Sequence, residues 1–313
     1  MKNYLAKRLA GALAVMLVVV TVVFLIVRVA PGDPASLMLG PEATATDVAD
    51  LRNRMGLDAP IGTQYILFVG QLLRGDLGDS VFINRPVAAI LLERAEPTGF
   101  LALFSILIGC AIALPIGILS AYRRGSAFDQ VSTSFAMLAA SIPSFWLSLL
   151  LMQALAVRLG WLPVSGYGPP GASLSERLVH LILPSLALGV LVSAIILRFT
   201  RASMIEALSQ DFIRTARSKG MSEARVVLKH ALKNALIPII TIIGLVIGSL
   251  ISGAIVVETV FGIPGVGSLV VQAVLRRDYP VIQGALLVTA ALYVLVNLAV
   301  DLLYLLVDRR VNY

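Results

Sequence analysis

Six stretches of the chain are apolar enough and long enough to cross a lipid bilayer. They lie near residues 9–29, 99–121, 132–157, 179–200, 236–260 and 282–307. A helix needs about 20 residues to cross a hydrocarbon layer roughly 30 Å thick, and each stretch meets that length. Polar segments rich in Gly and Pro separate them. The pattern predicts an all-α polytopic membrane protein with six transmembrane helices.

Composition supports this class of protein. Hydrophobic residues make up 58% of the 313 residues and charged residues only 14%, and the mean hydropathy is +0.92. Such values lie far outside the range of soluble globular domains. A cleaved signal peptide is the alternative for the first stretch, but its apolar run is longer than usual and no small-residue cleavage site follows. We therefore expect a retained first helix.

The distribution of Lys and Arg predicts the orientation. If the N-terminus is cytoplasmic, 15 of the 25 basic residues fall in short cytoplasmic segments that flank the spans, as the positive-inside rule requires. Both termini are then cytoplasmic. The hydrophilic residues 31–97 form a small extracytoplasmic insert between the first two spans. Its aspartates match no calcium-loop spacing and are expected to be solvated.

These features divide the chain into three parts. Residues 1–30 hold the N-terminal tail and first span, residues 31–97 the insert, and residues 98–308 the remaining core, with a basic loop at 202–235. An apolar segment from Leu269 to Leu275 is too short to span the membrane. We expect either a re-entrant helix or plain anchoring at the membrane interface.

Small residues recur every four positions in the fifth span, so they share one helix face that can approach another helix closely. They are candidates for helix packing or for the translocation path, together with the Gly and Pro residues that follow the span: Gly244, Gly248, Ser252, Gly262, Pro264 and Gly265.

The basic loop has a more specific pattern. The segment from Arg198 to Lys233 contains eight basic residues and only three acidic ones. Ile213 to Lys219 is predicted to form a helix that Gly220 ends in a left-handed conformation. Ser222 is a good N-cap for a second helix, which continues until Pro238 disturbs it.

On the second helix, one stripe is basic and a neighbouring strip is apolar. The stripe contains Arg225, Lys229 and Lys233, and the strip contains Val227, Leu228, Ala231 and Ala235. Anionic lipid headgroups would explain the charge alone, but they require no glycine at a fixed position. The alternative is a two-helix knob that docks into a partner protein.

Chemistry of other kinds is poorly supported. The sequence has no Gly-x-x-x-x-Gly-Lys-Ser/Thr loop for nucleotide phosphates, no metal-ligand cluster around His180 or His230, and no catalytic constellation,. An ion-coupled carrier or channel would require ionisable residues near the middle of the membrane. The candidates Arg28, Glu258 and Asp301 lie near the ends of spans, where they can reach an interface.

Several motifs resemble the permease subunits of ABC importers of the dipeptide, oligopeptide and nickel family. They include PGDP at 31–34, GLDAP at 56–60, GDLGDS at 75–80, ILPSLALG at 182–189, RFTRASM at 198–204 and VVETVFGIPGVG at 256–267. The family carries a cytoplasmic EAA motif whose glycine aligns with Gly220. Arg214, Thr215 and Ala216 then occupy the Glu-Ala-Ala positions. The departures from the general motif are similar to those of the peptide branch.

The resemblance implies a type I importer fold, and a coupling loop that contacts an ATPase. The implied coupling residues are Arg214, Thr215, Ala216, Arg217, Lys219, Gly220, Ser222, Lys229, His230 and Asn234. The implied partners are a second permease subunit, two ATPase subunits that bind ATP and Mg, an extracytoplasmic solute-binding protein and membrane lipid, but no nucleic acid. The chain itself is expected to bind no cofactor or metal and to catalyse no reaction.

The resemblance further implies residence in a bacterial plasma (inner) membrane and transport of dipeptides, oligopeptides or a related ligand such as glutathione or a nickel chelate. No cluster of residues in the sequence names the ligand.

Overall fold

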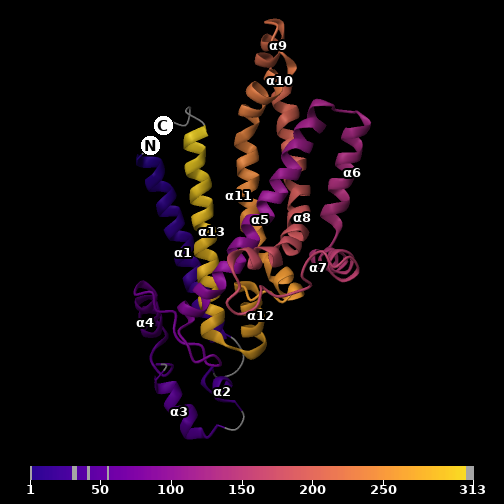
Figure 1. Ribbon diagram of the computed structural model, residues 1–313. Coiled ribbons are helices and arrows are strands. Elements are labelled where there is room, and N and C mark those ends of the chain that lie inside the picture. Colours follow the sequence, from indigo (N-terminus) through magenta and orange to yellow (C-terminus); the bar gives the residue numbers. More distant parts are fainter. Residues whose placement is uncertain (1, 30–33, 41–42, 55, 308–313) are drawn as a thin grey trace. The chain divides into compact units, whose positions relative to one another are not determined.

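The computed structural model describes residues 2–29, 34–40, 43–54 and 56–307 (Figure 1). This part of the chain is helical, and its only strand-like feature is an isolated bridge between Asp79 and Pro86. Contacts divide the chain into two compact units. The first contains Met1–Glu96 with Ser268–Leu295, and the second contains Pro97–Gly267 with Val296–Tyr313.

The first unit contains short helices and the ends of longer ones. They are α1 (Lys2–Val29), α2 (Pro34–Leu39), α3 (Ala45–Arg54), α4 (Ile61–Leu73), the start of α5 (Val87–Tyr122), most of α12 (Val266–Arg276) and the start of α13 (Tyr279–Val307). The apolar helix α4 packs on α1, because the Phe24 ring lies against Tyr65 and Phe68. Arg28 donates to the Gln64 side chain at 2.9 Å, so its guanidinium has a polar partner within the unit.

The second unit contains the longest helices. They are the rest of α5, α6 (Ala127–Ser141), α7 (Ser144–Leu151), the π-helix η1 (Met152–Arg158), α8 (Leu174–Leu208), α9 (Asp211–Ser218), α10 (Glu223–Arg225), the π-helix η2 (Val226–Ala231) and α11 (Leu232–Phe261). Helix α8 begins at a capping box in which Ser173 and Glu176 satisfy each other's backbone groups,. Its buried face forms the core together with α11 and α5.

Glycines allow α5 and α8 to pack at short distance. A Cβ atom on Gly117 would lie 2.9 Å from the Thr200 side chain, and one on Gly189 would lie 2.7 Å from Ile108. Real side chains essentially never approach so closely, so these positions accept only glycine without a shift of the neighbouring helix. Close contact through small residues is the usual way in which membrane helices associate.

The third predicted span is not one straight helix. Helix α6 ends at Ser141, α7 begins at Ser144, and the two parts of the span are bent by 102°. Pro143 explains the break, because a proline disfavours helical backbone at the residue before it. Ile142 has an extended conformation with ψ 126°. The prediction of a continuous helix over residues 132–157 is therefore wrong.

Two other boundaries differ from the prediction. Helix α5 begins at Val87, within the expected insert and about a dozen residues before the predicted span. Helix α11 contains Pro238 and continues to Phe261, so the expected disturbance at this proline does not occur. In a membrane helix, other donors such as Ser or Thr side chains can satisfy the carbonyl that loses its hydrogen bond at a proline.

By length and composition, five helices in the described part can cross a membrane: α1, α5, α8, the segment from Glu223 to Leu250, and α13. Two further apolar segments are bent at a short break. One combines α6 with α7 and η1, and the other combines the end of α11 with α12. If each segment counts as one span, the total is seven. The count of six membrane spans therefore remains a prediction. Residues 31–33 of the PGDP motif, the C-terminal Asp308, Arg309 and Arg310, and the Ser252 side chain lie outside the described residues.

Candidate functional site

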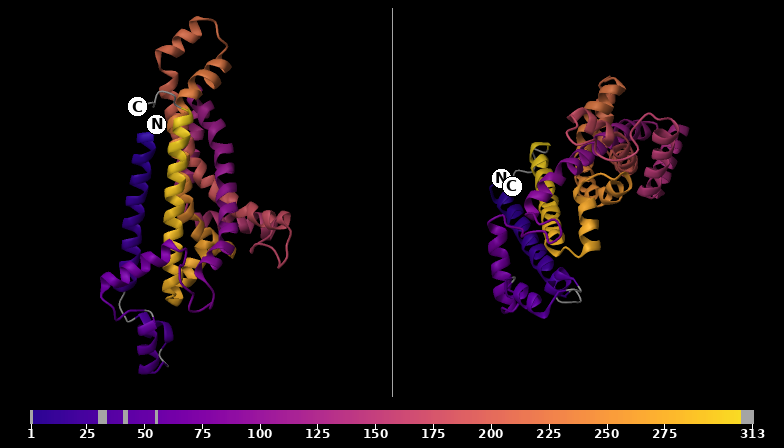
Figure 2. Two further views of the ribbon diagram at one scale, coloured as in Figure 1. Left: turned by 90° about the vertical axis from the view of Figure 1, so that its left-hand side faces the viewer. Right: turned by 60° about the horizontal axis from the view of Figure 1, so that its bottom comes forward.

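The basic loop folds into a small helical hairpin, which we call the knob (residues 211–231). Helix α9 ends at Ser218, and Gly220 adopts a left-handed conformation with φ +73°. Ser222 then takes the N-cap position of α10, although its hydroxyl makes no capping hydrogen bond. Figures 1 and 2 show this hairpin projecting beyond the ends of α8 and α11. The predicted helix, left-handed glycine and second helix are all present in the structure.

An ion pair closes the turn around Gly220. The Arg217 guanidinium donates to both carboxylate oxygens of Glu223, at 2.8 and 3.2 Å. This carboxylate raises the pKa of Arg217. Both side chains are more than 40% exposed, so the pair contributes at most about 1 kcal/mol. The pair thus links the end of α9 to the start of α10.

An apolar core fixes the knob to the membrane helices. Ile213, Val226 and Ala231 are fully buried. With Ala216 and Val227 of the knob, they form one buried cluster with residues from the ends of α5, α8 and α11: Ala121, Met204, Ala207, Ala235 and Ile239. Each Å² of apolar surface that is removed from water contributes about 25 cal/mol, so burial of this cluster stabilises the attachment of the knob to the helices. The knob and these helix ends therefore form one packed body.

The outer face of the knob combines positive charge with exposed apolar side chains. Arg214, Lys219, Arg225 and Lys229 are exposed, as is Lys233 just beyond the knob at the start of α11. Phe212 is 40% exposed and Leu228 is 58% exposed. Large exposed apolar side chains rimmed by polar ones are typical of a surface that another protein covers.

Leu228 is exposed, whereas the other members of the predicted apolar strip, Val227, Ala231 and Ala235, are buried. The segment Val226–Ala231 is a π-helix, in which bonds join residues five positions apart. Val226 and Ala231 therefore share the inner face, and Leu228 turns outward. A strip drawn with ordinary α-helical spacing places Leu228 inside.

Most of the implied coupling residues lie on the surface of this one hairpin and its continuation into α11. Ala216 is buried, His230 is half-buried, and the others are exposed: Arg214, Thr215, Arg217, Lys219, Gly220, Ser222, Lys229 and Asn234. The Asn234 amide donates to the His230 carbonyl at 2.9 Å. Sequence reasoning did not identify Glu223 as the partner of Arg217. Their opposite charges on either side of Gly220 are the signal for this pair.

The second set of candidates lies along α11. Gly244 is buried, and a Cβ atom there would lie 2.3 Å from Cγ2 of Val300 on α13. Val300 thus occupies the space that a pore would need at this position, which favours helix packing. Gly248 is also buried. At the end of α11, Gly262 adopts a left-handed conformation with φ +61° and ends the helix. Pro264 is exposed.

Glu258 was expected to reach an interface, but it is fully buried. The Thr98 hydroxyl donates to its Oε1 at 2.6 Å and accepts from the Val266 amide at 2.9 Å. Gly265 lies against the carboxyl group, where a Cβ atom would be 2.2 Å from Cδ. The carboxylate therefore holds together the start of the second unit's α5 segment, the end of α11 and the loop after it.

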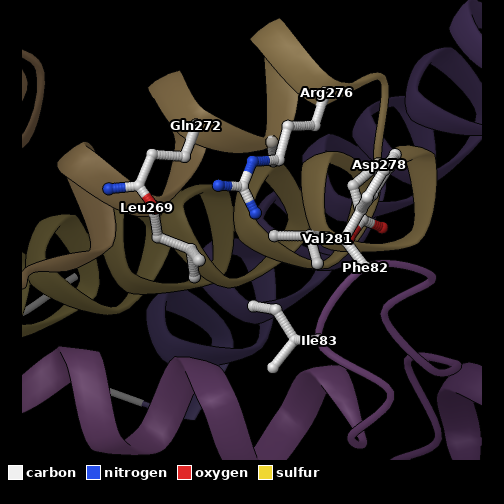
Figure 3. Close-up of a pocket in the computed structure, with 8 residues that line it drawn as sticks. Phe82, Ile83, Leu269, Gln272, Arg276, Asp278 and Val281 are labelled. Atoms are coloured by element: carbon white, nitrogen blue, oxygen red, sulfur yellow. The ribbon is translucent and has the colours of Figure 1, made fainter.

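A small pocket lies in the first unit (Figure 3). Its lining includes Phe82, Leu269, Arg276 and Asp278. The Ser80 hydroxyl donates to Oδ2 of Asp278 at 2.6 Å, whereas Oδ1 is buried and has no partner among the described residues. No group of three His, Cys, Asp or Glu residues in the described part of the chain could hold a metal ion.

A second cavity, of about 240 Å³, lies in the second unit beside the break between α6 and α7. It is lined by apolar residues and three polar or small ones, Ser144, Ser249 and Gly253. A charge-free lining of this kind suits an apolar side chain or a hydrocarbon tail.

An all-helical chain with several membrane-spanning helices, a projecting basic knob and no nucleotide-binding loop in its sequence has the properties of a transporter's membrane subunit. Comparison with known families specifies this class. Residues 113–313 match the family described as the binding-protein-dependent transport system inner membrane component, and residues 1–91 match its N-terminal family. The chain belongs to this family.

Two of the relatives show how far the similarity extends. The chain is 44% identical over 313 residues, all of both chains, to the glutathione transport system permease protein GsiC of Salmonella choleraesuis. It is 42% identical over 310 residues, 99% of both chains, to a probable peptide ABC transporter permease protein, y4tP, of Sinorhizobium fredii. These matches confirm the peptide-type permease resemblance found in the motifs.

Solved structures confirm the fold. An inward-facing structure of the MetNI methionine ABC transporter matches 70% of this chain and 96% of its own chain, with a TM-score of 0.57 and 19% sequence identity. The protein is a multi-pass membrane permease subunit of a binding-protein-dependent importer.

Proposed function

We propose that this chain forms half of the translocation path of an ATP-driven importer and that the knob is its contact with the ATPase. The single observation that carries the proposal is the knob's two-sided construction. Its inner face is buried with α5, α8 and α11, while its outer face carries the basic residues and the exposed Leu228. When a partner displaces the outer face of such a body, the membrane helices packed on its inner face move with it.

The proposed assembly contains a homologous second permease, two ABC ATPase subunits and an extracytoplasmic solute-binding protein, all surrounded by lipid. ATP and Mg bind the ATPase subunits, and this chain binds no cofactor and catalyses no reaction. The knob then lies in the cytoplasm of a bacterium, both termini lie on the same side of the inner membrane, and residues 31–97 face outward. The excess of basic residues in the knob supports this orientation,.

We propose dipeptides, oligopeptides or a related small ligand such as glutathione or a nickel chelate as the substrate. Support comes from the relatives named as peptide and glutathione permeases. ATP binding closes the ATPase dimer, the docked knobs move as rigid bodies, and the helices alternate between inward-facing and outward-facing arrangements.

Cross-linking tests the contact. With the single Cys110 replaced by Ser, Leu228→Cys places a thiol on the outer face of the knob. A short thiol-to-amine cross-linker should join it to the co-expressed ATPase. Asp50→Cys, exposed on α3, is the matched control and should not react with the ATPase. Cross-linking from Asp50 but not from Leu228 would refute the proposed contact.

Uptake separates this function from its alternative. Liposomes that contain the permease pair, ATPase and binding protein should take up substrate only with ATP. Gradient-driven uptake by the purified chain alone would instead indicate a stand-alone ion-coupled carrier or channel.

A further inference from the structure

A buried ion pair joins three helix ends in the second unit. Asp129, in the first turn of α6, has a side chain that is only 4% exposed. Arg201 of α8 donates to it twice, from Nε to Oδ1 at 2.6 Å and from Nη2 to Oδ2 at 2.8 Å. The Ser120 hydroxyl also donates to Oδ1, and the Gly125 amide donates to Oδ2 at 2.9 Å. Both carboxylate oxygens are thus fully paired.

This arrangement exceeds what the local fold needs. Ser126 already caps α6 by accepting a hydrogen bond from the Asp129 amide, so the helix could begin without the carboxylate. A bidentate guanidinium–carboxylate pair is both stronger and more directional than a neutral hydrogen bond. The pair therefore fixes the distance and the angle between α8 and the start of α6.

The ion pair lies beside the core that holds the knob. Ala121, the residue after Ser120, belongs to that buried core, as does Met204, three residues after Arg201 on the same helix. Helix α8 ends at Leu208, and only Ser209 and Gln210 separate it from α9 of the knob. A displacement of the knob therefore reaches Arg201 through less than two turns of helix.

We propose that the Asp129–Arg201 pair is the joint that makes the ends of α5 and α6 move with α8 when the knob moves. Arg201 and Asp129 are then positioning residues for transport. The inference rests on the proposed coupling role of the knob. Without the joint, the knob and α8 would still respond to the ATPase, while α5 and α6 would follow incompletely. Hydrolysis would continue, and each ATP would move less substrate.

The test measures ATP hydrolysis and substrate uptake in the complete reconstituted transporter, expressed as ATP consumed per substrate moved. Asp129→Asn and Arg201→Gln should raise this ratio at least tenfold while hydrolysis stays within about twofold of the wild type. Arg201→Lys keeps the charge but loses the bidentate geometry, and it should raise the ratio less. A parallel fall of hydrolysis and uptake, or an unchanged ratio, would overturn the proposal.

Two further variants keep the test decisive. If Asp129→Asn fails to accumulate in the membrane, Asp129→Glu keeps the negative charge but displaces the carboxylate from the Arg201 guanidinium; it should also raise the ratio, and an unchanged ratio would overturn the proposal. Asp58→Asn breaks the exposed Arg52–Asp58 pair of 3.0 Å and should leave the ratio unchanged. A wild-type complex whose hydrolysis never drives uptake would refute the coupling function itself, which separates that failure from failure of the joint.

Discussion

Substitutions of Gly220 should weaken the coupling between ATP hydrolysis and uptake. The size of the effect should depend only on how well the new residue tolerates the left-handed backbone. Gly220 has φ +73°, and no heavy atom lies within 4 Å of the position that a Cβ would occupy. A new side chain therefore meets no neighbour, and the only penalty is the left-handed conformation. That penalty is about 1–2 kcal/mol for an ordinary L-residue. Asn tolerates the conformation better, and a β-branched residue tolerates it worse.

These energies predict a graded series. A penalty of about 1–2 kcal/mol lowers the population of the correct turn roughly 5–30-fold relative to alternatives. Gly220→Asn should couple nearly as well as the wild type, Gly220→Ala less well, and Gly220→Val least. The assay is ATP-dependent uptake by the reconstituted transporter, together with the yield of the Leu228→Cys cross-link to the ATPase.

Gly171 provides the matched control. It has φ +81° and also has no atom within 4 Å of its Cβ position, but it lies in the loop before α8, outside the knob. Gly171→Ala should therefore have the same backbone penalty without loss of the cross-link. If Gly220→Val and Gly220→Asn behave alike, or if Gly171→Ala reduces the cross-link equally, the role assigned to the left-handed turn is wrong.

Two other substitutions test close packing along α11. Gly244→Ala places a Cβ 2.3 Å from Val300. It should lower the stability of the purified subunit in thermal unfolding by about 1–3 kcal/mol. Adding Val300→Ala should restore that stability, and a double variant that stays destabilised would contradict the contact. Gly265→Ala places a Cβ 2.2 Å from the buried Glu258 carboxyl group and should prevent membrane accumulation on immunoblots, whereas Gly99→Ala, with open space around it, should accumulate normally.

The fold class and the turn of the knob were predictable because they depend on local signals. Apolar stretches of about 20 residues indicate membrane helices whatever their neighbours are. A glycine between a basic helix and a Ser-Glu start predicts the left-handed turn at Gly220, which the structure confirms. These signals lie within a few residues of the structure they determine.

Features that depend on distant residues were not predictable from one sequence. Asp129 and Arg201 are 72 positions apart, and Thr98 and Glu258 are 160 positions apart. An acidic residue near a helix end has the same local pattern whether lipid headgroups, solvent or another helix surrounds it. Only the fold brings the partner into contact. Burial of Glu258 was missed for this reason, and so was the joint at Asp129.

Prolines illustrate the same limit in a single residue type. Pro97, Pro115, Pro184 and Pro238 all lie inside continuous helices, whereas Pro143 separates two helices by 102°. Each removes one backbone donor, so the local defect is identical. Burial does not separate the two outcomes, because Pro184 is buried whereas Pro115 and Pro238 are exposed within continuous helices. What differs is the backbone of the residue before the proline: Ile142 is extended, with ψ 126°. A proline disfavours helical backbone at that residue, so it marks a place where a helix can end, and the conformation of the preceding residue decides whether it does.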